Sequence, residues 1–293
     1  MNTKILSQLM MQEPLLLEDR SGAFINMNAL ESAHNPSLFF GVGLCSSTQP
    51  AIAIPFDILS FFFMAEKLRR ILNLDTIFIL LADTHALSNS FMTREMVTIQ
   101  TKHMQTTFTA IIRNLHLTHF KILSSSQFHE EATFQKIVFS IPHMENEYVR
   151  QEIADMRWFF KCKNVRIKLG WAIDIRETSH GHDERFFDRH IASKTSIPLT
   201  FIHMKAGRTF DPKRPKASPY IAVKGESRLM LKDNENVIQK FQQAKETSSM
   251  DVINGVRSHA GLIIRLFEEL FIRIPLPTLE EKIQFVINLT TKI

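Results

Sequence analysis

The stretch Glu147–Phe160 combines an apolar stripe with side chains that can perform acid–base chemistry. Read as a helix, it places apolar residues at i, i+4, i+7 and i+11, as a core-facing helix does: Val149, Ile153, Met156 and Phe160. About a quarter turn away lies a second face, made of Tyr148, Glu152, Asp155 and Phe159. Carboxylates beside a buried stripe are costly to desolvate without a partner. This face therefore predicts either a solvated surface with ion pairs or the wall of a polar pocket for a cationic or amine-bearing ligand.

The composition is that of a soluble globular chain with a modest positive charge. The 293 residues are 44% hydrophobic and 22% charged, enough for one large or two modest domains. Only nine glycines occur, and no G-x-x-x-x-G-K loop exists, which argues against P-loop nucleotide chemistry. A net charge of +5 and a pI of about 9.2 are compatible with a polyanionic partner.

The cysteines and histidines define no metal site or disulfide framework. Cys45 and Cys162 fit a reducing compartment. His180, His182 and His190 are spaced two and eight residues apart, which fits no familiar zinc pattern. We therefore expect no metal and no cofactor.

The sequence contains no predicted membrane span. The first residues lack a continuous apolar segment with a cleavage site, and no segment reaches the roughly 18–20 apolar residues of a span. We expect a cytoplasmic protein, with export through a system that ignores the N-terminus left open.

Apolar runs alternate with amphipathic stretches through most of the chain. Five runs are typical of buried strands: Leu38–Leu44, Leu74–Ala82, Phe120–Ser124, Val165–Ala172 and Ile197–Met204. The stretches between them predict helices, so the fold class is α/β, with a Rossmann-like parallel sheet covered by helices on both faces. We expect a helical lead-in over 1–37, a catalytic domain over 38–225 and a C-terminal helical segment over 226–293.

Ligands of such sheets bind beyond the carboxyl ends of the strands. Three polar segments follow strands directly and are expected to share one rim: Cys45–Ser47, Asp83–His85 and Ser124–Ser126.

Several motifs together resemble the catalytic domain of class I tyrosyl- and tryptophanyl-tRNA synthetases. Leu80–Ala86 (LLADTHA) is similar to their ADLHA signature, and Tyr148, Glu152 and Asp155 match the helix that holds their amino acid. Gly181–Ala192 resembles their G-x-D-Q-R helix, and Lys216–Val223 a shortened lysine–serine loop with its following strand. The resemblance extends from about Phe39 to Val223 and implies the class I catalytic fold, followed by C-terminal helices.

Two departures argue against ATP-dependent activation. The segment Pro50–Asp57, where the histidine signature belongs, contains no histidine and no glycine. The lysine–serine loop lacks its repeated serines. Both motifs stabilise charge on the transferring phosphates, so their loss points away from adenylate formation.

A second resemblance, to the tRNA-dependent cyclodipeptide synthases, accounts for these losses. That family keeps the scaffold, uses no ATP and has a Tyr-x-x-x-Glu pair, which Tyr148 and Glu152 match. It implies transfer of an aminoacyl group from aminoacyl-tRNA to a nucleophile after the first strand. The turn Gly41–Ser47 does not match the family's Gly-x-Ser cleanly, so Cys45, Ser46 and Ser47 all remain candidates.

The resemblance implies a role for each site residue. Glu152 would bind the ammonium of the aminoacyl group and help to deprotonate the attacking amine, while Tyr148 would orient it and relay a proton. The expected substrate-binding residues are Gly41, Gly43, Asp83, His85, Asp155, Trp171 and Asp183. For His85, a purely structural role is an equal alternative to substrate binding. Glu152 and Asp155 together suit a guanidinium, so arginyl-tRNA is one expected substrate.

Basic residues near the predicted pocket are expected to contact tRNA phosphates. The main group lies in a Gly- and Pro-broken loop: Lys205, Arg208, Lys213, Arg214 and Lys216. A second group follows the helix: Lys161, Lys163, Arg166 and Lys168. An ATP-using synthetase or its paralogue, and a non-catalytic synthetase-like binding protein, remain the alternative functions.

Overall fold

The computed structural model describes most of the chain, with gaps. The described residues are 2–16, 30–31, 33–43, 54–87, 92–142, 147–172, 199–205, 230–231, 236–247 and 250–292. The chain forms two compact units. Unit 1 comprises Met1–Ala51, Leu68–Phe108 and His119–Met204, and unit 2 comprises Ile52–Lys67, Thr109–Thr118 and Lys205–Ile293. The domain limits expected from sequence stay a prediction.

Unit 1 is built on a five-stranded sheet with the order β4-β3-β1-β5-β6. Its strands are β1 (Ser37–Gly43), β3 (Ile77–Ala82), β4 (Phe120–Ser124), β5 (Val165–Ala172) and β6 (Thr200–Lys205). The pairings of β1 with β3, β3 with β4, and β1 with β5 are all parallel. Because the chain fills one side of β1 before crossing to the other, the strand order reverses between β1 and β5, which is where such sheets bind ligands.

The central strands are buried on both faces, as their unbroken apolar sequences predict. Phe39 and Phe40 of β1 are buried, and so is every residue of β3 from Ile77 to Leu81. The strand β3 starts three residues later than predicted. The reason is that Asp75 and Thr76 belong to the preceding turn, in which the Asp75 amide donates to the carbonyl of Pro36.

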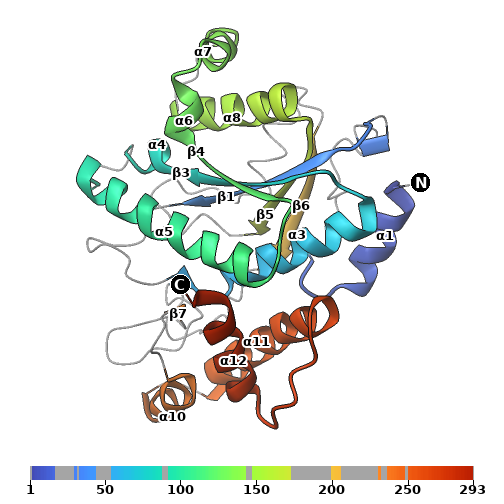
Figure 1. The fold of residues 1–293 in the computed structure, drawn as a ribbon, viewed down its shortest axis with the longest axis vertical. Coiled ribbons are helices and arrows are strands. Elements are labelled where there is room, and N and C mark those ends of the chain that lie inside the picture. Colours follow the sequence, from blue (N-terminus) through green and yellow to red (C-terminus); the bar gives the residue numbers. More distant parts are fainter. Residues whose placement is uncertain are drawn as a thin grey trace. The chain divides into compact units, whose positions relative to one another are not determined.

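Helices cover both faces of this sheet, which confirms the predicted α/β fold (Figure 1). The helix α8 (Glu147–Lys163) lies over one face, and α5 (Arg94–Asn114) lies over the other. Four shorter helices complete the described part of unit 1: α1 (Asn2–Gln12), α4 (Asp83–Ala86), α6 (Ser125–His129) and α7 (Ala132–Phe139). The start of α6 is fixed by a capping box, in which Gln127 accepts from the Ser124 amide at 3.0 Å.

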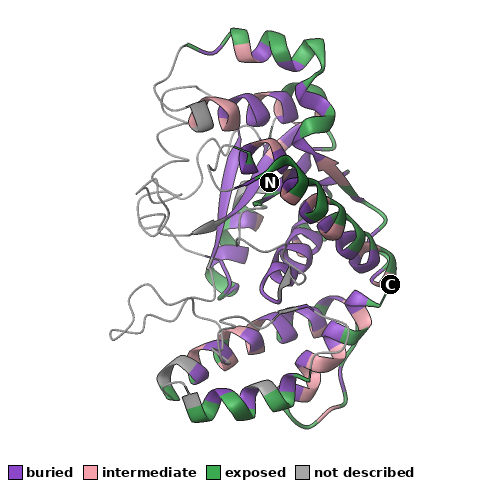
Figure 2. Cartoon of the chain, turned by 90° about the vertical axis from the view of Figure 1, so that its left-hand side faces the viewer, coloured by how far each residue is buried: buried purple, intermediate pink, exposed green. Residues whose placement is uncertain are grey.

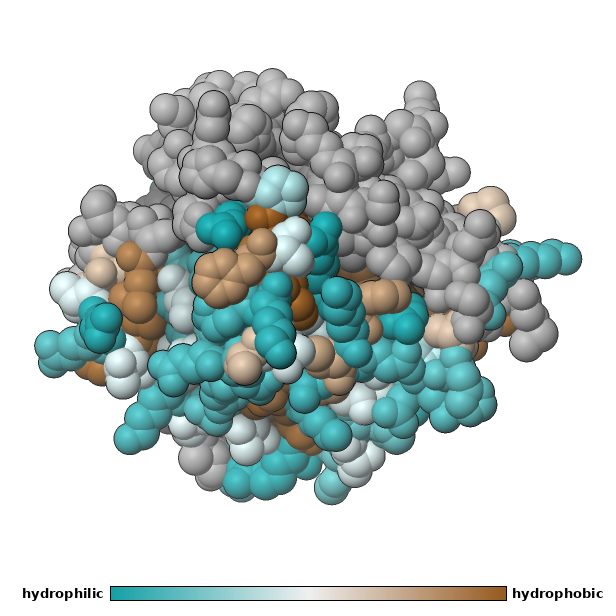
Figure 3. Space-filling model, turned by 90° about the horizontal axis from the view of Figure 1, so that it is seen from above, coloured by the Kyte–Doolittle hydropathy of each residue, from teal (hydrophilic) through white to brown (hydrophobic). Residues whose placement is uncertain are grey.

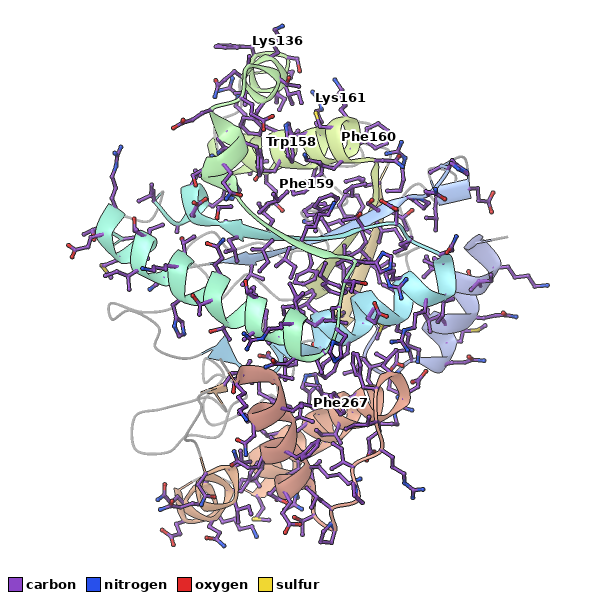
Figure 4. The ribbon with its side chains drawn as sticks, viewed as in Figure 1. Lys136, Trp158, Phe159, Phe160, Lys161 and Phe267 are labelled. Atoms are coloured by element: carbon purple, nitrogen blue, oxygen red, sulfur yellow. The ribbon has the colours of Figure 1, made fainter. Side chains whose placement is uncertain are left out.

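Aromatic rings fill the space between α8 and the sheet. Phe159 stacks on Phe39 of β1 with centroids 4.5 Å apart, and Trp158 stacks on Phe128 at 4.0 Å. Figure 4 shows Phe159 on the sheet side of α8 and Lys161 on its opposite side. Phe159 was expected on the polar face, yet it is fully buried. The reason is that Phe159 faces the sheet, where its ring contacts Phe39 of β1 and Phe78 of β3.

The helix α7 is the least covered part of this face. Figure 2 shows it as mainly exposed, and Phe139 at its end is 80% exposed. Seen from above, the described surface is mostly hydrophilic with scattered apolar side chains (Figure 3). Only Phe134 and Ile137 of α7 are buried, and both belong to the core beneath it.

Unit 2 is mainly helical. Its elements include α10 (Val237–Thr247), α11 (Met250–Leu270), α12 (Leu279–Thr291) and most of α3 (Ile58–Leu72). Phe63 of α3 contacts Phe267 and Phe271, with ring centroids 5.4 and 5.7 Å apart. A two-residue strand, β2 (Ile54–Pro55), pairs antiparallel with β7 (Met230–Leu231), which sequence analysis did not predict. None of the helices described in either unit is long and apolar enough to cross a membrane.

The stacked aromatic rings predict where a substitution in unit 1 lowers stability most. Replacing Phe159 with Ala removes a fully buried ring, which costs about 3–5 kcal/mol of unfolding free energy. The matched control is Phe139→Ala, whose exposed ring should change stability by less than about 0.5 kcal/mol. Urea denaturation of both variants checks this, and equal effects would contradict the packing described above.

A half-buried histidine, His259, predicts an acid-sensitive contribution to the stability of unit 2. Burial lowers the pKa of His259 from 6.5 to about 4, and no hydrogen-bond partner meets its Nε2 atom. Between these values the unfolded chain binds more protons, so stability falls on acidification, by at most about 3 kcal/mol near pH 4. His259→Leu should flatten the pH dependence of thermal unfolding relative to the wild type. The control variant His116→Asn, at an exposed position, should show the same pH dependence of thermal unfolding as the wild type.

Candidate functional site

A buried carboxylate on α8 lies at the centre of the polar cluster in unit 1. Asp155 is 2% exposed and contacts two histidines. The Nε2 atom of His85 lies 3.0 Å from Oδ2 of Asp155, and Nε2 of His129 lies 2.6 Å from Oδ1. His85 belongs to α4, directly after β3, and His129 ends α6, which follows β4. Asp155 therefore connects α8 to the carboxyl ends of two neighbouring strands.

The contacts of His129 determine which of its ring nitrogens faces Asp155 as a hydrogen-bond donor. The side-chain amide of Gln151 donates to its Nδ1 atom at 3.0 Å and also to Thr84 Oγ1 at 3.3 Å. Because an amide nitrogen only donates, Nδ1 of His129 accepts, and the ring proton lies on Nε2, toward Asp155. The ring also stacks on Phe134, with centroids 4.2 Å apart. His129 is therefore an oriented donor to Asp155.

His85 carries the positive charge of this cluster more readily than an ordinary histidine. Its burial alone would lower its pKa. The hydrogen bond and charge of Asp155, together with the charges of Glu152 and Asp83, outweigh burial and raise the pKa above 6.5. The surroundings of His85 thus favour its protonated form beside the buried carboxylate of Asp155.

Asp83 forms a second connection along the same rim. Its Oδ1 atom accepts from the backbone amides of Thr84 and Ser126, both at 2.9 Å. Its Oδ2 atom accepts from the hydroxyl of Ser126. These bonds hold α4 against α6, as expected for polar segments that follow adjacent parallel strands.

Glu152 is bound by a lysine of the neighbouring strand. The Nζ atom of Lys168, on β5, lies 2.8 Å from Oε1 of Glu152. The two side chains are 6% and 18% exposed, respectively. Lys168 was expected to contact tRNA phosphates, which this burial contradicts. Its backbone belongs to an inner strand, opposite Phe39 of β1, so its side chain is directed into the unit.

The structure describes only part of the predicted site. Gly41 and Gly43 lie at the end of β1, where an added β-carbon would meet no atom of the described residues within 4 Å. The backbones of Tyr148, Trp171 and Lys205 belong to α8, β5 and β6, but their side chains lie outside the description. The remaining predicted residues lie wholly outside the described residues: Cys45, Ser46, Ser47, Asp183, Arg208, Lys213, Arg214 and Lys216.

The structure brings His85 and Asp155 together but gives each carboxylate a partner from within the chain. Glu152 and Asp155 were expected to bind one guanidinium jointly. Instead, Asp155 contacts two histidines and Glu152 contacts Lys168.

Sequence analysis missed two residues of the cluster, His129 and Gln151. The position of His129, just after the third strand, was the available signal. No group of three or more His, Cys, Asp and Glu side chains within the described ranges is arranged to hold a metal ion.

Comparison with solved structures identifies the fold. The tyrosyl-tRNA synthetase of Archaeoglobus fulgidus, complexed with L-tyrosine, is similar with a TM-score of 0.55 and 14% identity, over 82% of this chain and 74% of that chain. The tryptophanyl-tRNA synthetase of Plasmodium falciparum has a TM-score of 0.55 and 15% identity, over 98% of this chain and 85% of that chain. The tryptophanyl-tRNA synthetase of Giardia lamblia has a TM-score of 0.53 and 11% identity, over 92% of this chain and 84% of that chain. No protein-family model and no curated protein sequence matches the chain. These likenesses confirm the class I synthetase catalytic fold.

The raised pKa of His85 predicts a pH-dependent contribution to stability. A folded-state pKa above 6.5 means that this contribution is complete below pH 6.5 and is lost as the pH rises through the folded-state pKa. Asp155→Asn removes the charge that holds the proton. The stability difference between wild type and variant should therefore be largest near pH 6 and shrink toward alkaline pH. Urea denaturation at several pH values measures it, and a difference that grows with pH would refute the assignment.

Proposed function

We propose that this chain is a tRNA-dependent cyclodipeptide synthase, an aminoacyltransferase that works without ATP. The observation that carries the proposal is the position of Glu152. It lies four residues after Tyr148 on α8, partly buried and bound to an ammonium. A carboxylate that binds the lysine ammonium is chemically suited to the ammonium of an aminoacyl group.

The described end of the segment Pro50–Asp57, just before α3, supports the absence of ATP chemistry. The resemblance places the histidine signature of the synthetases in this segment. Phe56 and Asp57 are buried there. Neither side chain offers a hydrogen-bond donor to a developing phosphate charge.

The proposed chemistry uses two esters that are already activated. The nucleophile after β1 (Cys45, Ser46 or Ser47) attacks the carbonyl carbon of the first aminoacyl-tRNA. The bond to the ribose oxygen breaks, and the nucleophile's proton passes to that oxygen. Gly41 and Gly43, at the end of the same strand, are proposed to lie beside the acyl group.

The two later steps form amide bonds. The amine of the acyl-enzyme loses a proton with the help of Glu152 and attacks the second ester, releasing the second tRNA with its hydroxyl restored. The new terminal amine then attacks the enzyme-bound ester. This step closes the six-membered ring and restores the nucleophile, so no oxidant or further energy source is needed.

Aminoacyl-tRNAs are the proposed partners, and arginyl-tRNA is a specific candidate. This choice rests on the two carboxylates of α8. A guanidinium that reaches Asp155 has to replace contacts made by His85 or His129. Labelled arginine in the product would support this choice. If cyclic dipeptides form but none contains arginine, the choice of arginine is wrong and the proposed reaction stands.

The product assay tests the proposal. The protein, incubated with a mixture of charged tRNAs, should yield a cyclic dipeptide by mass spectrometry, and deacylated tRNAs should yield none. Glu152→Gln should lower the yield at least about 100-fold because the amine loses both its binding group and its base. The control Glu269→Gln, in an exposed pair with Lys67, should match the wild type.

Other outcomes distinguish the alternatives. Robust ATP–pyrophosphate exchange would indicate a synthetase, and binding of charged tRNA without any product would indicate a non-catalytic relative. Cys45→Ala, Ser46→Ala and Ser47→Ala locate the nucleophile, because only its loss abolishes the acyl-enzyme in intact-mass spectra. If all three variants remain active, the covalent route is wrong.

A further inference from the structure

The pair formed by Lys168 and Glu152 is unusually buried for a lysine–glutamate contact. The Lys168 side chain is 6% exposed. In the other two such pairs found in the described part of the chain, the lysines Lys67 and Lys282 are 12% and 25% exposed. Burial of an ion pair costs both partners their hydration and usually gains little stability over apolar residues. The location of this pair therefore calls for an explanation other than stability.

The pair lies where a ligand amine is expected. Lys168 is on β5, which flanks the reversal of strand order next to β1, and Glu152 is on α8, over the same side of the sheet. Lysine has a long flexible stem that allows its ammonium to move without the backbone. Arginine at this position would form a more rigid, forked contact.

The neighbouring carboxylates are held more firmly. Both oxygens of Asp155 accept from histidines, and those of Asp83 accept from two amides and a hydroxyl. These donors belong to short helices whose positions depend on the bonds. Glu152 is thus the carboxylate of this described cluster whose recorded partner is an ammonium on a long side chain, which also lies over the ring of Phe201.

We propose that Lys168 is a resident ammonium of the amine-binding site and that a ligand enters by exchanging its own ammonium for that of Lys168 on Glu152. The inference rests on the proposed function, in which this ligand is the α-amine of an aminoacyl group. The ligand class is a primary amine, because an ammonium is the group that Lys168 presents to Glu152. Lys168 is accordingly a specificity-determining residue.

The proposal has a signature that a purely structural pair lacks. Two ammonium groups compete for one carboxylate, so removal of the lysine charge strengthens ligand binding. If Lys168 instead held Glu152 in position for the ligand, its removal would weaken binding. The direction of the change separates the two roles.

The test is calorimetric titration with the amides of the standard amino acids, each of which carries a free α-amine. Lys168→Met should bind at least one amide about tenfold tighter than the wild type, and the N-acetylated amides should not bind. The control Lys282→Met removes a pair of the same 2.8 Å length in unit 2 and should keep the wild-type affinity. Weaker, equal or undetectable binding by Lys168→Met overturns the proposal.

Two further measurements guard against a variant that does not fold. The double variant Lys168→Met/Glu152→Gln replaces both charges with side chains of similar size and should fold but lose amide binding. If it binds as tightly as Lys168→Met, Glu152 is not the amine site. In Lys168→Ala, n-propylammonium should raise the melting temperature by several degrees, whereas tetramethylammonium should not. No difference between these salts also overturns the proposal.

These binding experiments are independent of acyl transfer. A chain that exchanges amines but forms no cyclic dipeptide contradicts the proposed function and leaves the role of Lys168 intact. A chain that forms the product, while Lys168→Met binds amides no tighter, contradicts the inference alone.

Discussion

The arrangement of the candidate site depends on one buried carboxylate, Asp155, and on the two imidazoles that satisfy it. A carboxylate that is 2% exposed is tolerated only where hydrogen bonds replace its hydration. His85 and His129 supply these bonds from the ends of two adjacent strands. The need to satisfy Asp155 therefore holds α4, α6 and α8 in one arrangement. The aromatic layer around Phe159 supports the same arrangement from below, because it holds α8 against the sheet.

Charge compensation within this cluster determines which chemistry is open to it. Asp83 and Asp155 accept hydrogen bonds from donors on short helices, and these bonds connect the helices to one another and to α8. Glu152 contacts the ammonium of Lys168, which belongs to the neighbouring strand β5. The fold that carries this cluster is shared with tyrosyl- and tryptophanyl-tRNA synthetases.

Much of the fold was predictable because its signals are local. The strands β4 and β5 have the predicted bounds, since each is a short apolar run between clear breaks. The helix α8 begins where its periodicity begins. By contrast, the two-residue strands β2 and β7 carry no pattern, and their pairing joins segments far apart in the chain. The burial of Phe159 was missed because periodicity identifies an apolar stripe and does not show how far around the helix the contact with the sheet extends.

The sequence by itself determined the α/β class, the order of the strands along the chain and the presence of Tyr148, Glu152 and Asp155 on one helix. Only the tertiary structure decided which partner each carboxylate has. The contact of His85 with Asp155 spans 70 residues, and it exists because β3 and β4 are neighbours whose ends meet beneath α8. Likewise, Lys168 reads in sequence as a surface cation, and its burial follows from the inner position of β5. Helical spacing places side chains on a face, but the order of strands in the sheet determines what that face meets.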